Sequence, residues 1–278
     1  MKRQTSQSWQ GRKKIPGFKI LVKGIFHPED LDISYLDKDI KYSKEALDFM
    51  DKIMEAEIPN SKLFRVISYK VHDHKFSLVL GNTSFKHFIS SMDKRFVSKF
   101  GFKKIANPLS VGAIIVTSDY RIIIGKRLPE LVINPGKYST VAGMMDREKD
   151  FSNGKPDPFK AILRELYEEI KVEKTHVKEI VLLGLIYNED YHQTYLPFYI
   201  KIDIPSNILK RQLRHQSLSE NEFERFIYLK LNDRNIANFI ISNYKQMSQT
   251  CLGNILLFGE RMFGETWFKS LEKKLTSR

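Results

Sequence analysis

The stretch that most constrains the fold runs from Asp157 to Val172 and reads DPFKAILRELYEEIKV. Asp157 is suited to cap the N-terminus of a helix, and Pro158 suits the first helical position. The apolar side chains recur at helical spacing and form one stripe: Phe159, Ile162, Leu163, Leu166 and Ile170. We therefore expect an amphipathic helix whose stripe packs against a sheet.

Three glutamates, Glu165, Glu168 and Glu169, share a second arc of this helix beside the stripe. Glu165 and Glu169 have the i,i+4 spacing at which two like charges cost roughly 0.3 kcal/mol. A Glu-rich surface helix would explain them without any function. Alternatively, a bound divalent cation would turn the repulsion into binding, because Mg²⁺ prefers carboxylate oxygens and substrate phosphates as ligands.

The apolar runs on either side of this helix predict strands mixed with helices, which is typical of a layered α/β fold. We expect a basic flexible tail at 1–16, a small N-terminal α/β extension at 17–106 and a main domain at 107–278. In the extension we expect a strand at 18–26, a helix at 42–57, a hairpin turning at 72–74 and a helix at 85–101. In the main domain we expect strands within 111–127, 181–190, 194–204 and 225–231, and closing helices at 235–248 and 251–263.

A strand, Gly143, a loop and then Arg164-Glu165-Leu166-Tyr167-Glu168-Glu169 follow one another in this chain. This order resembles the signature of the Nudix hydrolases, whose fold is an α/β/α sandwich. Two departures stand out. Lys171 occupies the position of a glycine, and the interval from Gly143 to Arg164 is seven residues longer than in the family pattern. Glu148 or Asp150 in the longer loop could replace the first glutamate of the pattern as partner of Arg164.

The resemblance implies roles for individual residues. Mg²⁺ or Mn²⁺ would be bound by Glu165, Glu168, Glu169 and the backbone carbonyl of Ala142. Gly143 and Arg164 would be structural. Catalysis would depend on Glu165, Glu169 and a carboxylate later in the chain. Glu222 is the candidate for this later carboxylate, and Glu220 and Glu224 are rivals. One of these carboxylates would act as general base. The products would be two phosphate monoesters from a substrate of the form X–P–P–Y.

Further segments resemble the animal Nudix subgroup that cleaves UDP-glucose and UDP-galactose: 62–71, 78–88, 106–119 and 182–190. This similarity implies hydrolysis of a UDP-sugar to UMP and a sugar 1-phosphate. For substrate contacts we nominate Arg65 and Arg127, because a guanidinium suits bidentate binding of phosphate. Asn188, which follows an apolar strand, is a third candidate. Each arginine could equally be an ordinary surface residue.

The net charge of +13 favours polyanionic partners such as nucleotides, nucleic acid or anionic membrane, although it also serves solubility. The basic residues form clusters: five within 1–16, then Lys94, Arg95, Lys99, Lys103 and Lys104, and then Lys210, Arg211 and Arg214. The single cysteine, Cys251, excludes an intramolecular disulfide and makes a reducing cytoplasm the default location. No apolar run is long enough to span a membrane.

Several alternatives stay open. A Nudix hydrolase could act on capped or triphosphorylated RNA, with the basic clusters as its nucleic-acid contacts, or on ADP-ribose or dinucleoside polyphosphates. A non-catalytic Nudix module could bind a nucleotide without cutting it. The chain could also form a homodimer, with the extension either covering the site or making the interface.

Overall fold

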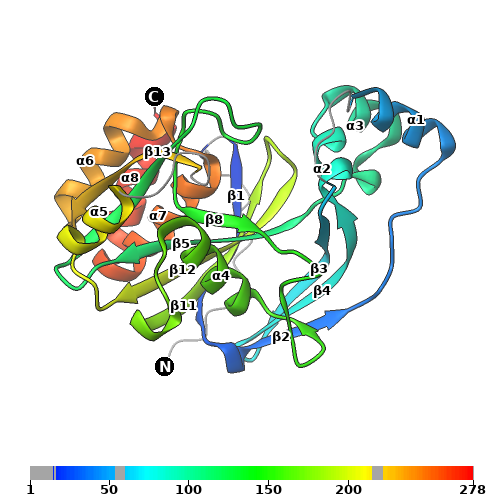
Figure 1. Ribbon diagram of the computed structural model, residues 1–278. Helices are drawn as coiled ribbons and strands as arrows, with labels where there is room; N and C mark the ends of the chain where they lie inside the picture. Colours follow the sequence, from blue (N-terminus) through cyan, green and yellow to red (C-terminus); the bar gives the residue numbers. More distant parts are fainter. Residues whose placement is uncertain (1–14, 16, 54–59, 215–221, 278) are drawn as a thin grey trace.

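The computed structural model describes residues 15, 17–53, 60–214 and 222–277 (Figure 1). The expected basic tail falls outside this range except for Ile15, and so do Glu220 and the end of the helix expected at 42–57. Strands and helices are interspersed along the described chain, which confirms the predicted α/β class.

A mixed sheet of eight strands forms the centre of the molecule. Its strands are β1 (Phe18–Phe26), β5 (Leu109–Val116), β6 (Arg121–Arg127), β7 (Tyr138–Ser139), β8 (Val141–Met144), β11 (Val177–Asn188), β12 (Gln193–Ile202) and β13 (Phe223–Lys230). The main path runs β1-β11-β12-β5-β6-β13, with β7 paired to β6 and β8 to β5. Only the β12–β5 pair is parallel. Every residue of β5 is buried, as expected for a strand covered on both faces.

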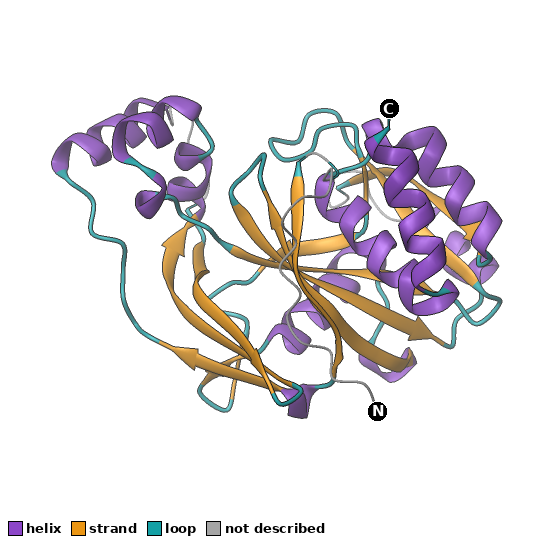
Figure 2. Cartoon of the chain, turned by 180° about the vertical axis from the view of Figure 1, so that it is seen from behind, coloured by secondary structure: helices purple, strands orange, loops and turns teal. Residues whose placement is uncertain are grey.

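Helices cover both faces of this sheet (Figures 1 and 2). One face carries α6 (Asp233–Asn243), α7 (Gln249–Phe263) and α8 (Glu265–Thr276). The other face carries α4 (Pro158–Ile170) and α5 (Ser206–Arg214), together with the sheet of the extension. Neither α5 nor α8 is among the helices expected from the sequence. The loop before α4 contains the short hairpin β9 (Phe151–Ser152) and β10 (Lys155–Pro156).

The N-terminal extension contains a three-stranded sheet and three short helices. The strands are β2 (Leu31–Tyr35), β3 (Lys62–His72) and β4 (Lys75–Ser84), and the helices are α1 (Lys44–Ile53), α2 (Phe85–Ser91) and α3 (Lys94–Phe100). The predicted hairpin turn is present, with positive φ angles at Asp73 and His74. The single helix expected at 85–101 is wrong, because the helix is interrupted before Asp93. The Asp93 carboxylate caps α3 by accepting a hydrogen bond from the backbone N–H of Arg95 at 2.7 Å.

The first strand lies elsewhere than the sequence analysis placed it. We grouped residues 18–26 with the extension, but β1 pairs with β11 at the edge of the large sheet. The close approach of β1 to β11 depends on Gly184, where a Cβ would lie 2.0 Å from the carbonyl oxygen of Val22. The sheet of the extension, in contrast, packs its buried side chains into the same core as α4, which places the extension next to the glutamate helix.

Candidate active site

Helix α4 begins as its sequence predicts. The Asp157 carboxylate accepts hydrogen bonds from the backbone N–H groups of Phe159 and Lys160 at 2.9 and 3.0 Å, and Pro158 occupies the first turn. The helix ends at Lys171, which adopts the left-handed conformation (φ 55°, ψ 32°) that glycine would adopt more easily. Because the apolar stripe is buried in the core, the glutamates lie along its edge, beside β8.

Strand β8 and helix α4 interlock through two of the glutamates. The N–H of Ala142 donates a hydrogen bond to Oε2 of Glu169 at 3.0 Å. At Gly143, the next residue, the Glu165 carboxylate occupies the space that a side chain would need. The glycine therefore permits the close approach between strand and helix that brings Glu165 and Glu169 to the same place.

Arg164 organises the acidic side chains around it. Its Nε and Nη2 donate to the two oxygens of Asp150 at 2.9 and 2.8 Å, and Asp150 is fully buried. Its Nη1 donates to Glu165 at 2.7 Å and to Glu168 at 2.9 Å. Asp150, and not Glu148, is thus the loop partner of Arg164. Burial disfavours the charged guanidinium, but these carboxylates outweigh it and raise the pKa of Arg164.

The two inner glutamates are held in unfavourable surroundings for a negative charge. Burial, Glu168 and Glu222 outweigh the opposing effect of Arg164 and raise the pKa of Glu165 to about 7. Burial, followed by the charges of Glu165 and Glu222, raises the pKa of Glu169 well above its ordinary value, although Arg127 and the N–H of Ala142 oppose the shift. A group of this kind binds a proton or a cation readily, and such groups cluster at functional sites.

The donor set around these glutamates suits a hard divalent cation, because every candidate ligand is an oxygen. In the part of the chain that the structure describes, however, no three acidic, histidine or cysteine side chains are arranged to hold a metal ion. The Arg164 guanidinium bridges Glu165 and Glu168 instead. Metal binding by Glu165, Glu168, Glu169 and the Ala142 carbonyl therefore stays a prediction, supported by the buried and mutually repelling carboxylates of Glu165 and Glu169.

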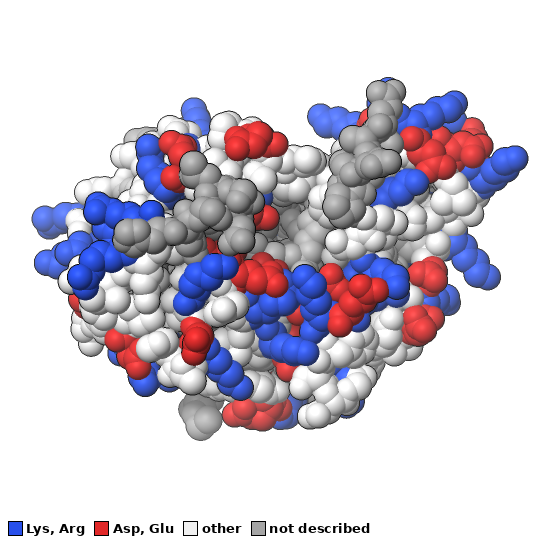
Figure 3. Space-filling view, viewed as in Figure 1, with Lys and Arg blue, Asp and Glu red and all other residues white. Residues whose placement is uncertain are grey.

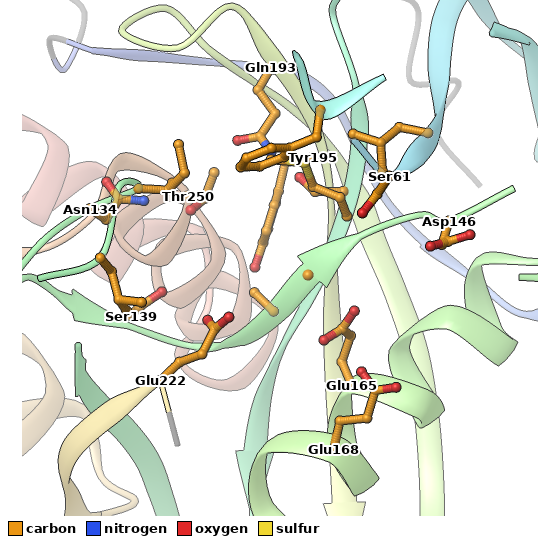
Figure 4. Close-up of a pocket in the computed structure, with 18 of the residues that line it drawn as sticks. Ser61, Asn134, Ser139, Asp146, Glu165, Glu168, Gln193, Tyr195, Glu222 and Thr250 are labelled. Atoms are coloured by element: carbon orange, nitrogen blue, oxygen red, sulfur yellow. The ribbon is translucent and has the colours of Figure 1, made fainter. Parts of the chain in front are cut away.

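Glu165 and Glu168 open onto a cavity of about 510 Å³, whereas Glu169 lies behind them and does not line it. Its charged lining residues are Arg127, Asp146, Lys149, Arg164, Glu165, Glu168 and Glu222. Figure 4 shows Glu165 and Glu168 pointing into it from α4, and Glu222 from the start of β13. The extension contributes Ser61, Leu63 and Phe85 to the wall. The extension therefore forms part of the cavity wall, and both roles considered for it stay predictions.

Arg127 and Glu222 form a pair inside this cavity. Nη1 of Arg127 donates to Oε2 of Glu222 at 2.8 Å, and its Nε donates to the carbonyl oxygen of Ile133 at 3.0 Å. The Arg127 residue is only 9% exposed, so its guanidinium is held in one place. The rival candidate Glu224 does not line the cavity and lies near Arg225 at the surface.

Two of the nominated substrate contacts, Arg65 and Asn188, lie away from the cavity, and their part in substrate binding stays a prediction. Arg65 lies half-buried on β3. Asn188 is 1% exposed, and its Oδ1 accepts from the N–H groups of Asp190 and Tyr191 at 3.0 and 3.3 Å. Asn188 therefore holds the turn between β11 and β12, a role that its position after an apolar strand also fits.

Sequence reasoning missed several polar residues of the cavity. Asn134, Ser139, Gln193 and Thr250 all line it, and they come from four separate segments of the chain. No motif connects them, so no signal in the sequence could have found them as a group.

The second and third basic clusters lie within the described residues, whereas the first does not. Figure 3 shows lysines and arginines interspersed with acidic residues on the face that it displays. Within the second cluster, Arg95 pairs with Asp93 and Lys99 pairs with Glu45. A nucleic-acid partner thus stays a prediction, and so does a homodimer. None of the described helices is long and apolar enough to cross a membrane.

No protein-family model matches the chain, and no curated protein does. Several solved structures are similar at low identity. An Ap4A hydrolase from C. elegans, solved as a binary complex, is 13% identical with a TM-score of 0.36, over 56% of this chain and 98% of that one. NrtR from Shewanella oneidensis is 16% identical with a TM-score of 0.37, over 55% and 63%. A MutT protein from Methanosarcina mazei is 12% identical with a TM-score of 0.33, over 60% and 93%. At these identities and TM-scores, the similar structures do not indicate a function for this chain, and we infer a function from the geometry of the site.

Proposed function

We propose that the protein is a Nudix-type pyrophosphohydrolase that cleaves a nucleoside diphosphate-linked substrate. The carrying observation is the pair Glu165 and Glu169, 7% and 8% exposed, whose pKa values are raised first by burial and then by neighbouring carboxylates, Glu168 and Glu222 for Glu165 and Glu165 and Glu222 for Glu169. Buried carboxylates that repel one another at a cavity favour a cationic ligand. Arg127 in the same cavity supplies a guanidinium, the group best matched to phosphate oxygens.

The chain's own residues would divide the work as follows. Glu165, Glu168, Glu169 and the Ala142 carbonyl would hold Mg²⁺ or Mn²⁺, and the bound ion would neutralise charge on the diphosphate oxygens. Arg127 would bind and orient a phosphate group. One cavity carboxylate, Glu165 or Glu222, would act as general base and accept a proton from the attacking water. A new P–O bond forms from that water, the anhydride P–O bond breaks, and its electrons leave with the second phosphate.

The finer proposal is a UDP-sugar, cleaved to UMP and a sugar 1-phosphate. It is supported by the four segments whose sequence is similar to the animal UDP-sugar subgroup. The cavity volume of about 510 Å³ also lies in the range of small-molecule sites. The extension also lengthens the cavity wall, so that a second part of the substrate could contact it beyond the diphosphate.

One observation favours a second candidate, a nucleotide-binding module without catalysis. Arg164 neutralises Glu165 and Glu168 directly, at 2.7 and 2.9 Å, so these two glutamates already have a cation. If that arrangement persisted with nucleotide bound, the diphosphate would be held by Arg127 and not cleaved.

Release of phosphate esters from a substrate panel separates the two candidates. The panel contains UDP-glucose, UDP-galactose, ADP-ribose, dinucleoside polyphosphates and capped RNA, each with Mg²⁺, Mn²⁺ or EDTA. We expect metal-dependent cleavage of the UDP-sugars, reduced at least about 100-fold in Glu169→Gln. Glu173→Gln is the matched control, because Glu173 is exposed and does not line the cavity.

Each other result has a distinct meaning. Cleavage of a different panel member would keep the reaction and replace the substrate. Nucleotide binding without turnover of any substrate would favour the binding module. Equal loss of activity in Glu173→Gln and Glu169→Gln would contradict the assignment of the site.

A further inference from the structure

Opposite Glu165 and Glu168, the cavity has a side lined by uncharged side chains, here called the neutral side, with the charged Asp146 at its edge beside Ser61 (Figure 4). Figure 4 shows Glu165 and Glu168 at the lower side and Gln193, Tyr195 and Ser61 at the upper side. A group bound at the upper side would therefore lie away from the charges that hold the diphosphate.

Gln193 is a buried polar side chain on the neutral side, unlike Ser61, which is exposed. It is 6% exposed, and among the described residues its carboxamide makes no hydrogen bond. The neighbouring Tyr195 hydroxyl, in contrast, lies 3.0 Å from the Thr140 hydroxyl and accepts from the Asn254 amide at 3.2 Å. Because its carboxamide lines the cavity and is not used within the protein, Gln193 is placed to hydrogen-bond a ligand.

An aromatic ring from the extension belongs to the same part of the wall. Phe85 is half-buried and lines the cavity, and its N–H donates to the carbonyl oxygen of Ser61 at 3.0 Å. Its ring contacts the fully buried Phe88, at 6.2 Å between centroids, which limits its movement. A fixed ring of this kind offers a flat apolar surface for stacking.

These two side chains together fit one kind of chemical group. A carboxamide presents a donor beside an acceptor, which matches the edge of a nucleobase, and an aromatic ring matches its face. A sugar would need several hydrogen-bond partners for its hydroxyl groups, which a single carboxamide does not supply. We propose that Gln193 and Phe85 form the recognition site for the base of the substrate, with Gln193 determining which base is accepted. The inference rests on the proposed function in assuming a nucleotide substrate.

Base selectivity can be measured without turnover. Calorimetry in EDTA would give the affinities of the full-length protein for UMP, CMP, AMP and GMP. We expect the unmodified protein to prefer one base at least about tenfold. Gln193→Met keeps the length of the side chain and removes its hydrogen bonds, so it should reduce the preference to about threefold or less. Phe85→Leu should weaken all four nucleotides together, because stacking depends little on the base. Gln212→Leu, at an exposed site on α5, is the matched control.

A second measurement assigns the two ends of the substrate. In Gln193→Met we expect the kcat/KM ratio of UDP-glucose to ADP-glucose to change at least fivefold, while the ratio of UDP-glucose to UDP-galactose stays constant. A change in the sugar ratio alone would overturn the inference, and so would unaltered base selectivity in a folded Gln193→Met protein, with folding checked by circular dichroism. If Gln193→Met does not fold, the test rests on Phe85→Leu, which must weaken the binding of all four nucleotides. Unchanged binding in Phe85→Leu would then overturn the inference. Base-selective binding without hydrolysis would refute the proposed function and leave this inference intact.

Discussion

Gly143 lies directly under the carboxylate of Glu165: a Cβ at position 143 would be 1.9 Å from Oε1 of the glutamate. The carboxylate cannot simply turn away, because the same oxygen accepts a hydrogen bond from Arg164 at 2.7 Å. The glycine and the glutamate therefore have to be considered as one structural unit.

Gly143→Ala should destabilise the protein by about 1–3 kcal/mol, the usual cost of forcing an extra carbon into a packed site. The cost should fall below about 0.5 kcal/mol when Glu165→Ala is also present, since the clashing carboxylate is then gone. Urea unfolding of the two single variants and the double variant measures this coupling. An unchanged cost in the double variant would show that another group excludes the methyl.

Asp150→Asn should be far more harmful than Glu148→Gln. Asp150 is fully buried and binds Arg164 through both oxygens, so its neutralisation leaves a largely buried guanidinium without its main partner and should cost about 3 kcal/mol. Glu148 pairs with Lys62 at the surface, where such pairs contribute about 1 kcal/mol or less. Urea midpoints of both variants test this difference. Equal midpoints would mean that Asp150 is not the anchor of the loop.

The metal-free protein should lose stability toward alkaline pH through Glu165. Its pKa is raised from 4.5 to about 7 by burial, so the folded state favours the protonated carboxyl. This contribution is fully present below the unfolded value and is lost as the pH rises through the folded value. Urea midpoints in EDTA at pH 5 and pH 8 should therefore fall further in the unmodified protein than in Glu165→Gln. If the carboxylates bind Mg²⁺, adding it at pH 8 should narrow the difference. Parallel pH profiles of the two proteins would contradict the raised pKa.

Lys171→Gly should stabilise the protein by roughly 1 kcal/mol. Lys171 has a φ of 55°, a left-handed conformation that costs a residue with a Cβ energy and costs glycine almost none. The control Lys160→Gly, in the first turn of α4, should instead destabilise by about 1 kcal/mol, because glycine is a poor helix former and the hydrogen bond from the Lys160 ammonium to the Phe151 carbonyl is lost. Thermal melting of both variants gives the two signs. A loss of stability in Lys171→Gly would show that contacts of the lysine side chain outweigh the backbone strain.

Much of the local structure was predictable because its causes lie within a few residues. The Asp157 cap, the Pro158 start and the apolar stripe of α4 are all short-range features, and the structure shows all three. The helix expected at 85–101 failed for an equally local reason, the competing cap at Asp93. The site prediction identified Glu165, Glu168 and Glu222 at the cavity, but Arg65 and Asn188 do not line it, because exposure depends on what packs over a residue.

The sequence by itself determined the glutamate helix, the α/β class and the glycine that lets strand and helix meet. Only the tertiary structure decided that Asp150 pairs with Arg164, that β1 joins the large sheet, and that the extension supplies part of the cavity wall. Caps and hydrophobic periodicity act between neighbours in the chain, so they can be read locally. Burial, pKa shifts and the lining of a cavity arise from side chains that are distant in sequence, such as Phe85 and Gln193, and exist only once the chain has folded.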